Sequence, residues 1–106
     1  MSFHHSAQDI RVEDGHRLHA QLQNEDGEWI DAEFDLNQIL GNDNGHFQWD
    51  AENFSHSAED ITFDIEGGES VPVLRALLRN EDGDAVWADV NLAERIGNDN
   101  GSFCVV

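Results

Sequence analysis

The sequence is a tandem duplication, and this restricts the folds that are open to it. Three segments of the first half return in the second half in the same order. They are GNDNGHF (41–47) and GNDNGSF (97–103), FHHSAQDI (3–10) and FSHSAEDI (54–61), and LHAQLQNEDG (18–27) and LRALLRNEDG (74–83). We therefore divide the chain into repeat 1, residues 3–53, and repeat 2, residues 54–106, with a slip in register within residues 66–72. A repeat of this size buries little surface alone, so we expect the two repeats to share one core.

Apolar and polar residues alternate along several short segments, which is typical of strands with one buried face. Leu18, Ala20 and Leu22 alternate with polar residues, and segments 30–36, 74–78 and 86–92 continue the pattern. An NEDG segment between two such runs predicts a hairpin, and DLNQIL and NLAERI predict single helical turns. We predict an all-β fold of two pseudo-symmetric halves, each a small antiparallel sheet plus a hairpin with short helical turns.

The chain is strongly acidic. It carries 23 Asp and Glu against 5 Arg and no Lys, which gives a net charge of −18. Nucleic acids and anionic membrane surfaces are bound through basic residues, so we expect neither nucleic acid nor membrane as a partner. An uncharged ligand is not repelled. The acidity also favours solubility and opposes self-association, and this alone is sufficient to explain it.

Cysteine content and the first residues bear on the cell compartment. Cys104 is the only cysteine, so no disulfide forms within the chain. The opening MSFHHSAQDI has neither a basic start nor an apolar stretch, unlike a secretory signal, and no apolar run is long enough to span a bilayer. We expect a soluble cytoplasmic protein that is a monomer, with a domain-swapped dimer as the alternative.

The segment DLNQILGNDNGHFQWDAENFSHSAEDI (35–61) resembles the cyanovirin-N homology lectins. In that family a strand, a helical turn, an N-x-D/N-G loop, a Trp and an NF step join two repeats. The resemblance covers residues 2–106 and implies a single domain, 1–106, whose repeats exchange strands. One structural half then comprises about residues 1–39 plus 96–106, and the other about 40–95.

The same resemblance implies a function. It implies a lectin that recognises terminal α1-2-linked mannose in oligosaccharides or glycoproteins, with one site in each half, no cofactor and no catalysis. Carried over position by position, site A consists of His5, Ser6, Gln23, Glu25, Asn98, Asp99 and Asn100. Site B consists of Asn42, Asn44, Asn53, Ser57, Arg79, Asn80 and Glu81. Each cluster takes its GNDNG loop from the opposite repeat.

These residue types suit a sugar on chemical grounds alone. Sugar hydroxyls donate and accept hydrogen bonds, an Asn amide does both, and Asp and Glu accept strongly. Each neutral bond contributes only about 0.5–1.5 kcal/mol, so a single site predicts an affinity of about micromolar order or weaker. The same residue types are also the usual formers of tight turns, and spacing alone favours that plainer interpretation.

One departure from the family pattern concerns stability. The founding bacterial member has two disulfides, and the matching positions here are Ala7 with Leu22 and Ala58 with Leu78. Apolar pairs replace both bridges, so the stability of this chain is expected to come from its core.

The sequence gives less support to a metal-binding or an enzymatic function. An EF-hand loop needs an acidic ligand five residues before its Gly, and those positions hold Leu22, Leu40, Leu78 and Ile96. The six His are scattered, which disfavours zinc, and no spacing singles out a carboxylate pair for glycoside hydrolysis. We expect no metal and no enzyme. The alternatives kept open are a protein–protein interaction module without glycan activity and a calcium-binding β domain.

The three tryptophans are further candidates for contact with a sugar. Trp49, beside Phe47, is expected in the core. Trp87 lies on the polar phase of its strand, and we retain it as a candidate contact with a ligand or another subunit.

Overall fold

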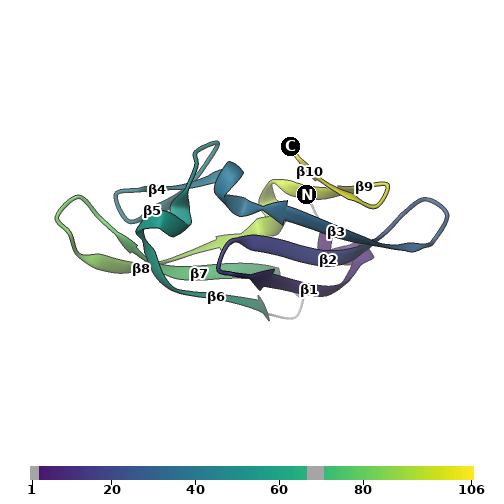
Figure 1. The fold of residues 1–106 in the computed structure, drawn as a ribbon, viewed down its shortest axis with the longest axis horizontal. Helices are drawn as coiled ribbons and strands as arrows, with labels where there is room; N and C mark the ends of the chain where they lie inside the picture. Colours follow the sequence, from purple (N-terminus) through teal and green to yellow (C-terminus); the bar gives the residue numbers. More distant parts are fainter. Residues whose placement is uncertain (1–2, 67–70) are drawn as a thin grey trace.

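The computed structural model describes residues 3–66 and 71–106 (Figure 1). Repeat 1 forms, in order, η1 (Phe3–Ser6), β1 (Ala7–Glu13), β2 (Arg17–Gln23), β3 (Trp29–Asp35), η2 (Leu36–Gln38), β4 (Leu40–Asp43) and β5 (His46–Trp49). Repeat 2 forms η3 (Phe54–Ser57), β6 (Ala58–Glu66), β7 (Val71–Arg79), β8 (Ala85–Asn91), η4 (Leu92–Glu94), β9 (Ile96–Asp99) and β10 (Ser102–Val105). The all-β prediction is confirmed, and every helix in the described part of the chain is a short 3₁₀ turn. None is long or apolar enough to cross a membrane.

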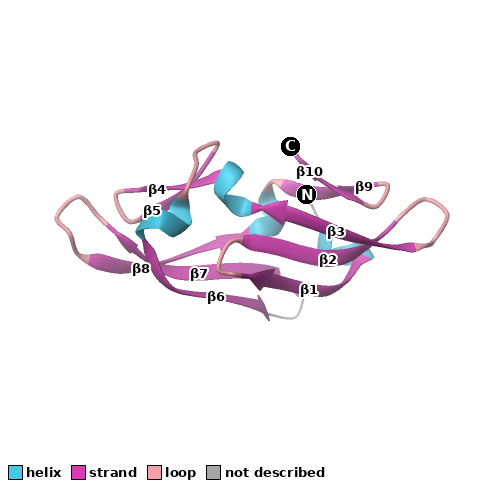
Figure 2. Ribbon diagram, in the orientation of Figure 1, coloured by secondary structure: helices cyan, strands magenta, loops and turns pink. Residues whose placement is uncertain are grey.

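Each repeat builds one sheet and one hairpin (Figure 2). Antiparallel strands in the order β1-β2-β3 form the first sheet, and β6-β7-β8 form the second. The hairpins are β4–β5 and β9–β10. The expected sheet, hairpin and helical turns therefore occur twice.

Each hairpin packs on the sheet of the other repeat (Figure 1). Strand β10 contacts β3 and β9 contacts η1, whereas β5 contacts β8 and β4 contacts η3. The molecule is elongated, with principal extents of 50 × 27 × 22 Å. The two hairpin–sheet junctions lie towards opposite ends of its long axis (Figure 1).

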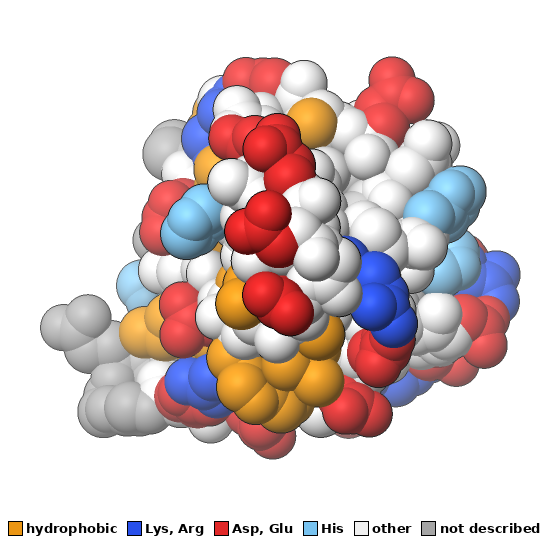
Figure 3. Space-filling view, turned by 90° about the vertical axis from the view of Figure 1, so that its left-hand side faces the viewer, with side chains coloured by type: hydrophobic (Ala, Val, Ile, Leu, Met, Phe, Trp, Pro, Cys, Tyr) orange, Lys and Arg blue, Asp and Glu red, His pale blue; other side chains and the backbone are white. Residues whose placement is uncertain are grey.

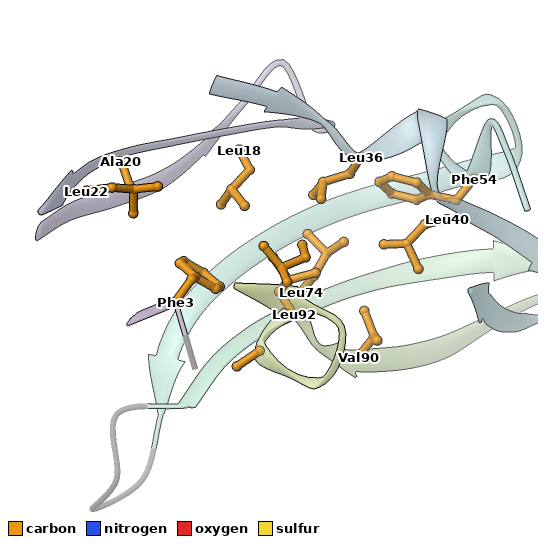
Figure 4. Close-up of a cluster of buried hydrophobic side chains, with 12 residues drawn as sticks. Phe3, Leu18, Ala20, Leu22, Leu36, Leu40, Phe54, Leu74, Val90 and Leu92 are labelled. Carbon is orange, nitrogen blue, oxygen red and sulfur yellow. The ribbon is translucent and has the colours of Figure 1, made fainter. Parts of the chain in front are cut away.

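The core follows the alternation in the sequence (Figure 4). The inward residues of β2 and β7 are almost wholly buried, with Leu18, Leu22, Leu74 and Leu78 at 0% exposure. A single cluster also includes η1, η2, η3 and η4, through Phe3, Leu36, Phe54 and Leu92 among others. Because its members come from both repeats, the core is shared, and neither repeat encloses it alone.

The alternation fails near the ends of two strands. Ile30 and Val86 fall on the apolar phase but are 39% and 36% exposed. Both lie where β3 and β8 extend beyond the core and meet the tips of the exchanged hairpins. Trp49 is only half-buried, although it packs against the core as expected.

Pro72 falls within the segment where the two repeats slip in register, but it lies in a regular strand. Pro72 is buried within β7 and pairs with Ile65 of β6. The pairing of β8 begins at Val73, so β7 has a neighbour on one side only at Pro72. Such an edge position tolerates the missing N–H. The rest of the slip in register, residues 67–70, lies outside the described residues.

The apolar pairs at the bridge positions are cross-strand neighbours. Ala7 is the ladder partner of Leu22, and Ala58 is the ladder partner of Leu78. Both leucines are fully buried in the core. Burial of such a side chain stabilises a fold by about 1.5–3 kcal/mol, which is similar to the contribution of a typical disulfide.

The helical turns η2 and η4 begin with equivalent caps. Asp35 Oδ1 accepts from the Asn37 N–H at 2.9 Å, and Asn91 Oδ1 accepts from the Ala93 N–H at 2.9 Å. Only Asp35 also contacts a histidine, with its Oδ1 2.9 Å from His16 Nδ1. Burial alone would raise the pKa of Asp35, but the hydrogen bonds from His16 and the Asn37 N–H outweigh it and hold the pKa below its ordinary value.

We predict that Asp35→Asn removes part of the acid sensitivity of the fold and leaves the cap intact, as Asn91 does in repeat 2. A depressed folded-state pKa stabilises the fold above about pH 4, and that contribution is lost as the pH falls through the folded pKa. In urea titrations the wild type should be more stable at pH 7 by less than about 1 kcal/mol, because the pair is partly exposed. The difference should shrink towards zero below about pH 4.

Asn91→Asp is the matched control, because it places a carboxylate at the same cap without a facing histidine. A stability difference between wild type and Asp35→Asn that stays constant with pH would contradict the assignment.

Candidate functional site

The two GNDNG segments form tight hairpin turns. Strand β4 ends at Asp43 and β5 begins at His46, so Asn44 and Gly45 alone make the connection. Their φ angles are +51° and +90°, and those of Asn100 and Gly101 are +50° and +93°. Positive φ at both central residues is typical of the type I′ turn that Asn-Gly favours.

Each turn glycine lies on a residue of the other repeat. A Cβ added to Gly101 would come within 3.1 Å of Ile30 Cγ1, and one added to Gly45 would come within 2.5 Å of Val86 Cγ2. The apolar residues exposed at the strand ends therefore form the floor on which the hairpin tips rest. This close approach explains why Ile30 and Val86 are apolar although they are not in the core.

At one end, Asn98 fastens the second hairpin to repeat 1. Its Nδ2 donates to Ser6 Oγ at 2.8 Å and to the Gln23 carbonyl at 2.9 Å. Its Oδ1 accepts from the Gly101 N–H at 2.9 Å. The amide is thus occupied within the protein, and its role is to position the loop.

At the other end, Asn42 makes the equivalent three bonds. Its Nδ2 donates to Ser57 Oγ at 2.8 Å and to the Arg79 carbonyl at 2.8 Å, and its Oδ1 accepts from the Gly45 N–H at 2.9 Å. We call Asn42 and Asn98, with these partners, the asparagine clamps.

The next asparagine in each loop contacts the facing NEDG turn. Asn100 Oδ1 accepts from the Glu25 N–H at 2.9 Å, and Asn44 Oδ1 accepts from the Glu81 N–H at 2.8 Å. Neither Nδ2 has a protein partner in the described part of the chain. These two amide groups are exposed and remain able to donate to a ligand.

The NEDG turns are held by their own asparagines. Asn80 Oδ1 accepts from the N–H groups of Asp82 and Asp84, both at 3.0 Å. Asn24 does the same in repeat 1. Asn80, which was expected to contact sugar, therefore uses its carbonyl oxygen to shape the turn.

The structure brings most of the predicted residues together, as two corners at opposite ends of the molecule (Figure 1). The site A corner joins Ser6, Gln23 and Glu25 of repeat 1 to Asn98, Asp99 and Asn100 of repeat 2. The site B corner joins Ser57, Arg79, Asn80 and Glu81 of repeat 2 to Asn42 and Asn44 of repeat 1.

Two predicted residues are less closely tied to the corners. Asn53 adopts a left-handed conformation, and its N–H donates to the Asn37 carbonyl at 2.8 Å. Among the described residues no hydrogen bond links it to the site B loops. His5 is exposed beside Ser6, with its ring 4.2 Å from that of His4. The use of any of these residues in sugar binding stays a prediction.

Asp43 was missed although the repeats point to it. It occupies the position in the first GNDNG loop that Asp99 occupies in the second, and both are exposed at the turn. Aligning the two repeats would have placed it in site B.

The corners differ in charge. Exposed carboxylates occur at both, but only site B carries a cation, Arg79, which pairs with Glu59 and reaches the Gly83 carbonyl at 3.3 Å. Gln23 replaces it at site A and reaches the Gly27 carbonyl at 3.3 Å. In residues 3–66 and 71–106 no group of three or more His, Cys, Asp or Glu is placed to hold a metal ion. Both corners therefore offer hydrogen-bonding groups for a ligand of low charge.

Comparison with known proteins identifies a family with this architecture. Residues 3–104 match the family model for the CVNH domain. A curated Neurospora crassa protein described as a cyanovirin-N homolog is 50% identical over 107 residues, which cover 97% of this chain and 96% of the relative.

Solved structures agree with the family match. The NMR structure of the CVNH from Gibberella zeae superposes with a TM-score of 0.93 at 52% identity, covering 98% of this chain and 96% of that one. A microvirin:mannobiose complex superposes with a TM-score of 0.87 at 27% identity, covering 98% and 97%. A MoCVNH3 variant in complex with (N-GlcNAc)4 gives 0.85 at 28%, covering 98% and 96%.

We predict that Asn98→Ala loosens one corner and leaves the other unchanged. The substitution removes three hydrogen bonds, and leaving the N–H of the buried Gly101 unsatisfied costs about 1–3 kcal/mol. Amide hydrogen exchange should show faster exchange at Gly101, with Gly45 retaining its protection. Asn42→Ala is the matched variant and should give the reverse pattern. Equal loss of protection at both glycines would mean that the clamps do not act locally.

Proposed function

This chain belongs to the CVNH family, and we propose that it is a lectin that binds terminal α1-2-linked mannose without catalysis. The observation that supports this most is the duplicated corner. The same two loops are locked by asparagine bonds at each end of the molecule, so the exposed groups are already in place before a ligand arrives.

Preorganised groups reduce the entropy that binding must overcome. At site A the groups left for a ligand are the Asn100 amide, the carboxylates of Glu25 and Asp99, and the exposed His5. Asn44, Glu81 and Asp43 are their counterparts at site B. Amide donors beside carboxylate acceptors suit the vicinal hydroxyls of a pyranose, each of which donates and accepts.

The relatives support carbohydrate binding, and one of them supports mannose as the sugar. Microvirin was solved in complex with mannobiose, and its fold superposes on that of this chain. The MoCVNH3 variant was solved with a GlcNAc oligomer, so specificity varies among proteins of this fold. The net charge of −18 favours a neutral saccharide over an anionic one.

Placement at opposite ends of a molecule 50 Å long makes the two sites independent for small ligands. A disaccharide occupies one corner at a time. A monomer with both sites occupied would join two glycan branches or two glycoproteins and would gain avidity from multivalency.

The test is an NMR titration with α1-2-mannobiose that follows the amides of residues 42–45, 79–82, 23–26 and 98–101. We predict shifts confined to these segments, with dissociation constants of about micromolar order or weaker. Cellobiose should cause none. If the GlcNAc tetramer shifts these amides and mannobiose does not, the proposed specificity for mannose is wrong, but the protein still binds carbohydrate. If no saccharide shifts them, the lectin proposal fails.

Asn44→Gly and Asn100→Gly assign the sites. Glycine keeps the positive φ of the turn but removes the side-chain amide. The loop then loses the bond to the facing turn and the Nδ2 donor that is left for a ligand. Each variant should weaken mannobiose binding at its own corner by about tenfold and leave the other corner unchanged. Each is thus the control for the other, and wild-type binding by both would exclude the asparagines as contacts.

A further inference from the structure

One end of the molecule carries aromatic residues that its counterpart lacks. His46, Trp49 and Trp87 lie around the junction of β5 with β8. The equivalent positions at the other end hold Ser102, Val105 and Asp31. The clamps and turns are the same at both ends, so the scaffold does not require these aromatic side chains.

The aromatic residues border a groove between β5 and β8. A cleft of about 500 Å³ is lined by His46, Phe47, Arg75, Trp87, Ala88 and Asp89. A second cleft, of about 380 Å³, shares Phe47, Arg75 and Asp89 and continues along the same strands to Trp49 and Asn91, and then to Glu94 of η4. We call the two together the β5–β8 groove. At the other end, a cleft of about 330 Å³ covers part of the equivalent positions and is lined by Arg11, His19, Ala20, Asp31, Ala32 and Glu33, with neither Trp nor Phe among them.

The groove begins beside site B. His46 directly follows the turn residue Gly45, and Trp87 directly follows Val86, on which Gly45 rests. A chain of sugars whose terminal unit lies at Asn44 therefore has His46, two residues along the chain, as the nearest groove residue in the sequence.

The side chains of the groove match a pyranose ring. Trp87 is 63% exposed and shares one face of β8 with Asp89, about 7 Å away along the strand. An indole offers a flat apolar surface to the C–H face of a sugar. Asp89 accepts from hydroxyls at the ring edge.

The polar groups of the groove are held in place. Arg75 donates to both carboxylate oxygens of Glu66, at 2.8 Å in the case of Nη2 and Oε1. Its Nε lies 3.8 Å from Asp89 Oδ2, directly across the β7–β8 ladder. A guanidinium held by Glu66, with the exposed carboxylate of Asp89 beside it, offers a hydroxyl both a donor and an acceptor.

The surface around Trp87 fits a sugar better than a second copy of the chain. Figure 3 views this end and shows one apolar patch surrounded by acidic and basic side chains. The large exposed hydrophobic residues of β8 are Val86 and Trp87, far less than an interface of about 1,000 Å² or more requires. Two copies would each also bring a net charge of −18.

We propose that the β5–β8 groove is an extension of site B that takes the next sugar residues of a neutral oligosaccharide, with one ring stacked on Trp87. The proposal rests on the proposed lectin function. It makes the two ends unequal: site B selects longer chains, whereas site A treats short and long chains alike.

The test compares α1-2-mannobiose with the α1-2-linked mannotriose and mannotetraose, titrated into wild type, Trp87→Ala and Trp29→Ala. Trp29 is also exposed, lies in repeat 1 and is the matched control. In the wild type the longer saccharides should bind site B about three- to tenfold more tightly than mannobiose and should shift the Trp87 indole N–H. Trp87→Ala should abolish this gain and leave mannobiose binding, site A and the remaining amide spectrum unchanged.

The outcomes separate the two proposals. If mannobiose binds but chain length makes no difference at site B, or Trp87→Ala retains the gain, the groove is not a subsite and the lectin function stands. If no mannose saccharide binds at either corner, both proposals fail. If sedimentation shows a wild-type dimer that Trp87→Ala dissociates, Trp87 is a subunit contact and the groove proposal fails.

Asp89→Asn keeps the size of the side chain and tests the second groove residue. It should weaken binding of the longer saccharides only, and an unchanged affinity would mean that Asp89 does not contact the sugar.

Discussion

The asparagine clamps are the interaction on which the candidate sites depend. Asn42 and Asn98 each bind a backbone carbonyl and a serine hydroxyl of the other repeat while holding the glycine of their own turn. The partners of each hairpin belong to the other repeat, so each corner is built from both repeats. The shared core has the same property, because its leucines come from both repeats. Folding and assembly of the sites are therefore one event.

The sequence predicted the elements better than the roles of their polar residues. Alternation at Leu18 to Leu22 is a local pattern, and the structure confirms the buried face it indicates. The exposure of Ile30 and Val86 depends on where the exchanged hairpin comes to rest, which no local pattern records. Asn98 was predicted as a sugar contact because the family resemblance assigns that role to its position. The structure occupies that amide within the protein, since partners distant in sequence lie within hydrogen-bonding distance.

The stability of this acidic chain depends on its core. Apolar pairs stand at Ala7–Leu22 and Ala58–Leu78, where the family's founding member has disulfides. Mutual repulsion of surface carboxylates destabilises a compact chain, and no covalent bridge offsets it here. The core must do so, and the described arginines help locally: Arg17 pairs with Asp14, Arg75 with Glu66 and Arg79 with Glu59. These pairs are partly exposed and weak, so stability rests mainly on the buried leucines.

Because the chain is a duplication, the two ends share one scaffold. The residues that differ between them mark positions that the scaffold does not constrain. The clamps, the turn glycines and the glutamates of the NEDG turns are identical at the two ends. The exposed residues around each corner, which we call the rim, differ between the ends. Gln23 occupies the position of Arg79, and Asp31 occupies the position of Trp87. Exchanging a residue that positions a loop through three bonds loosens the loop, whereas an exposed rim residue can be exchanged at little cost in stability. The rim is therefore where the two ends can acquire different ligand preferences while the fold that supports them stays the same.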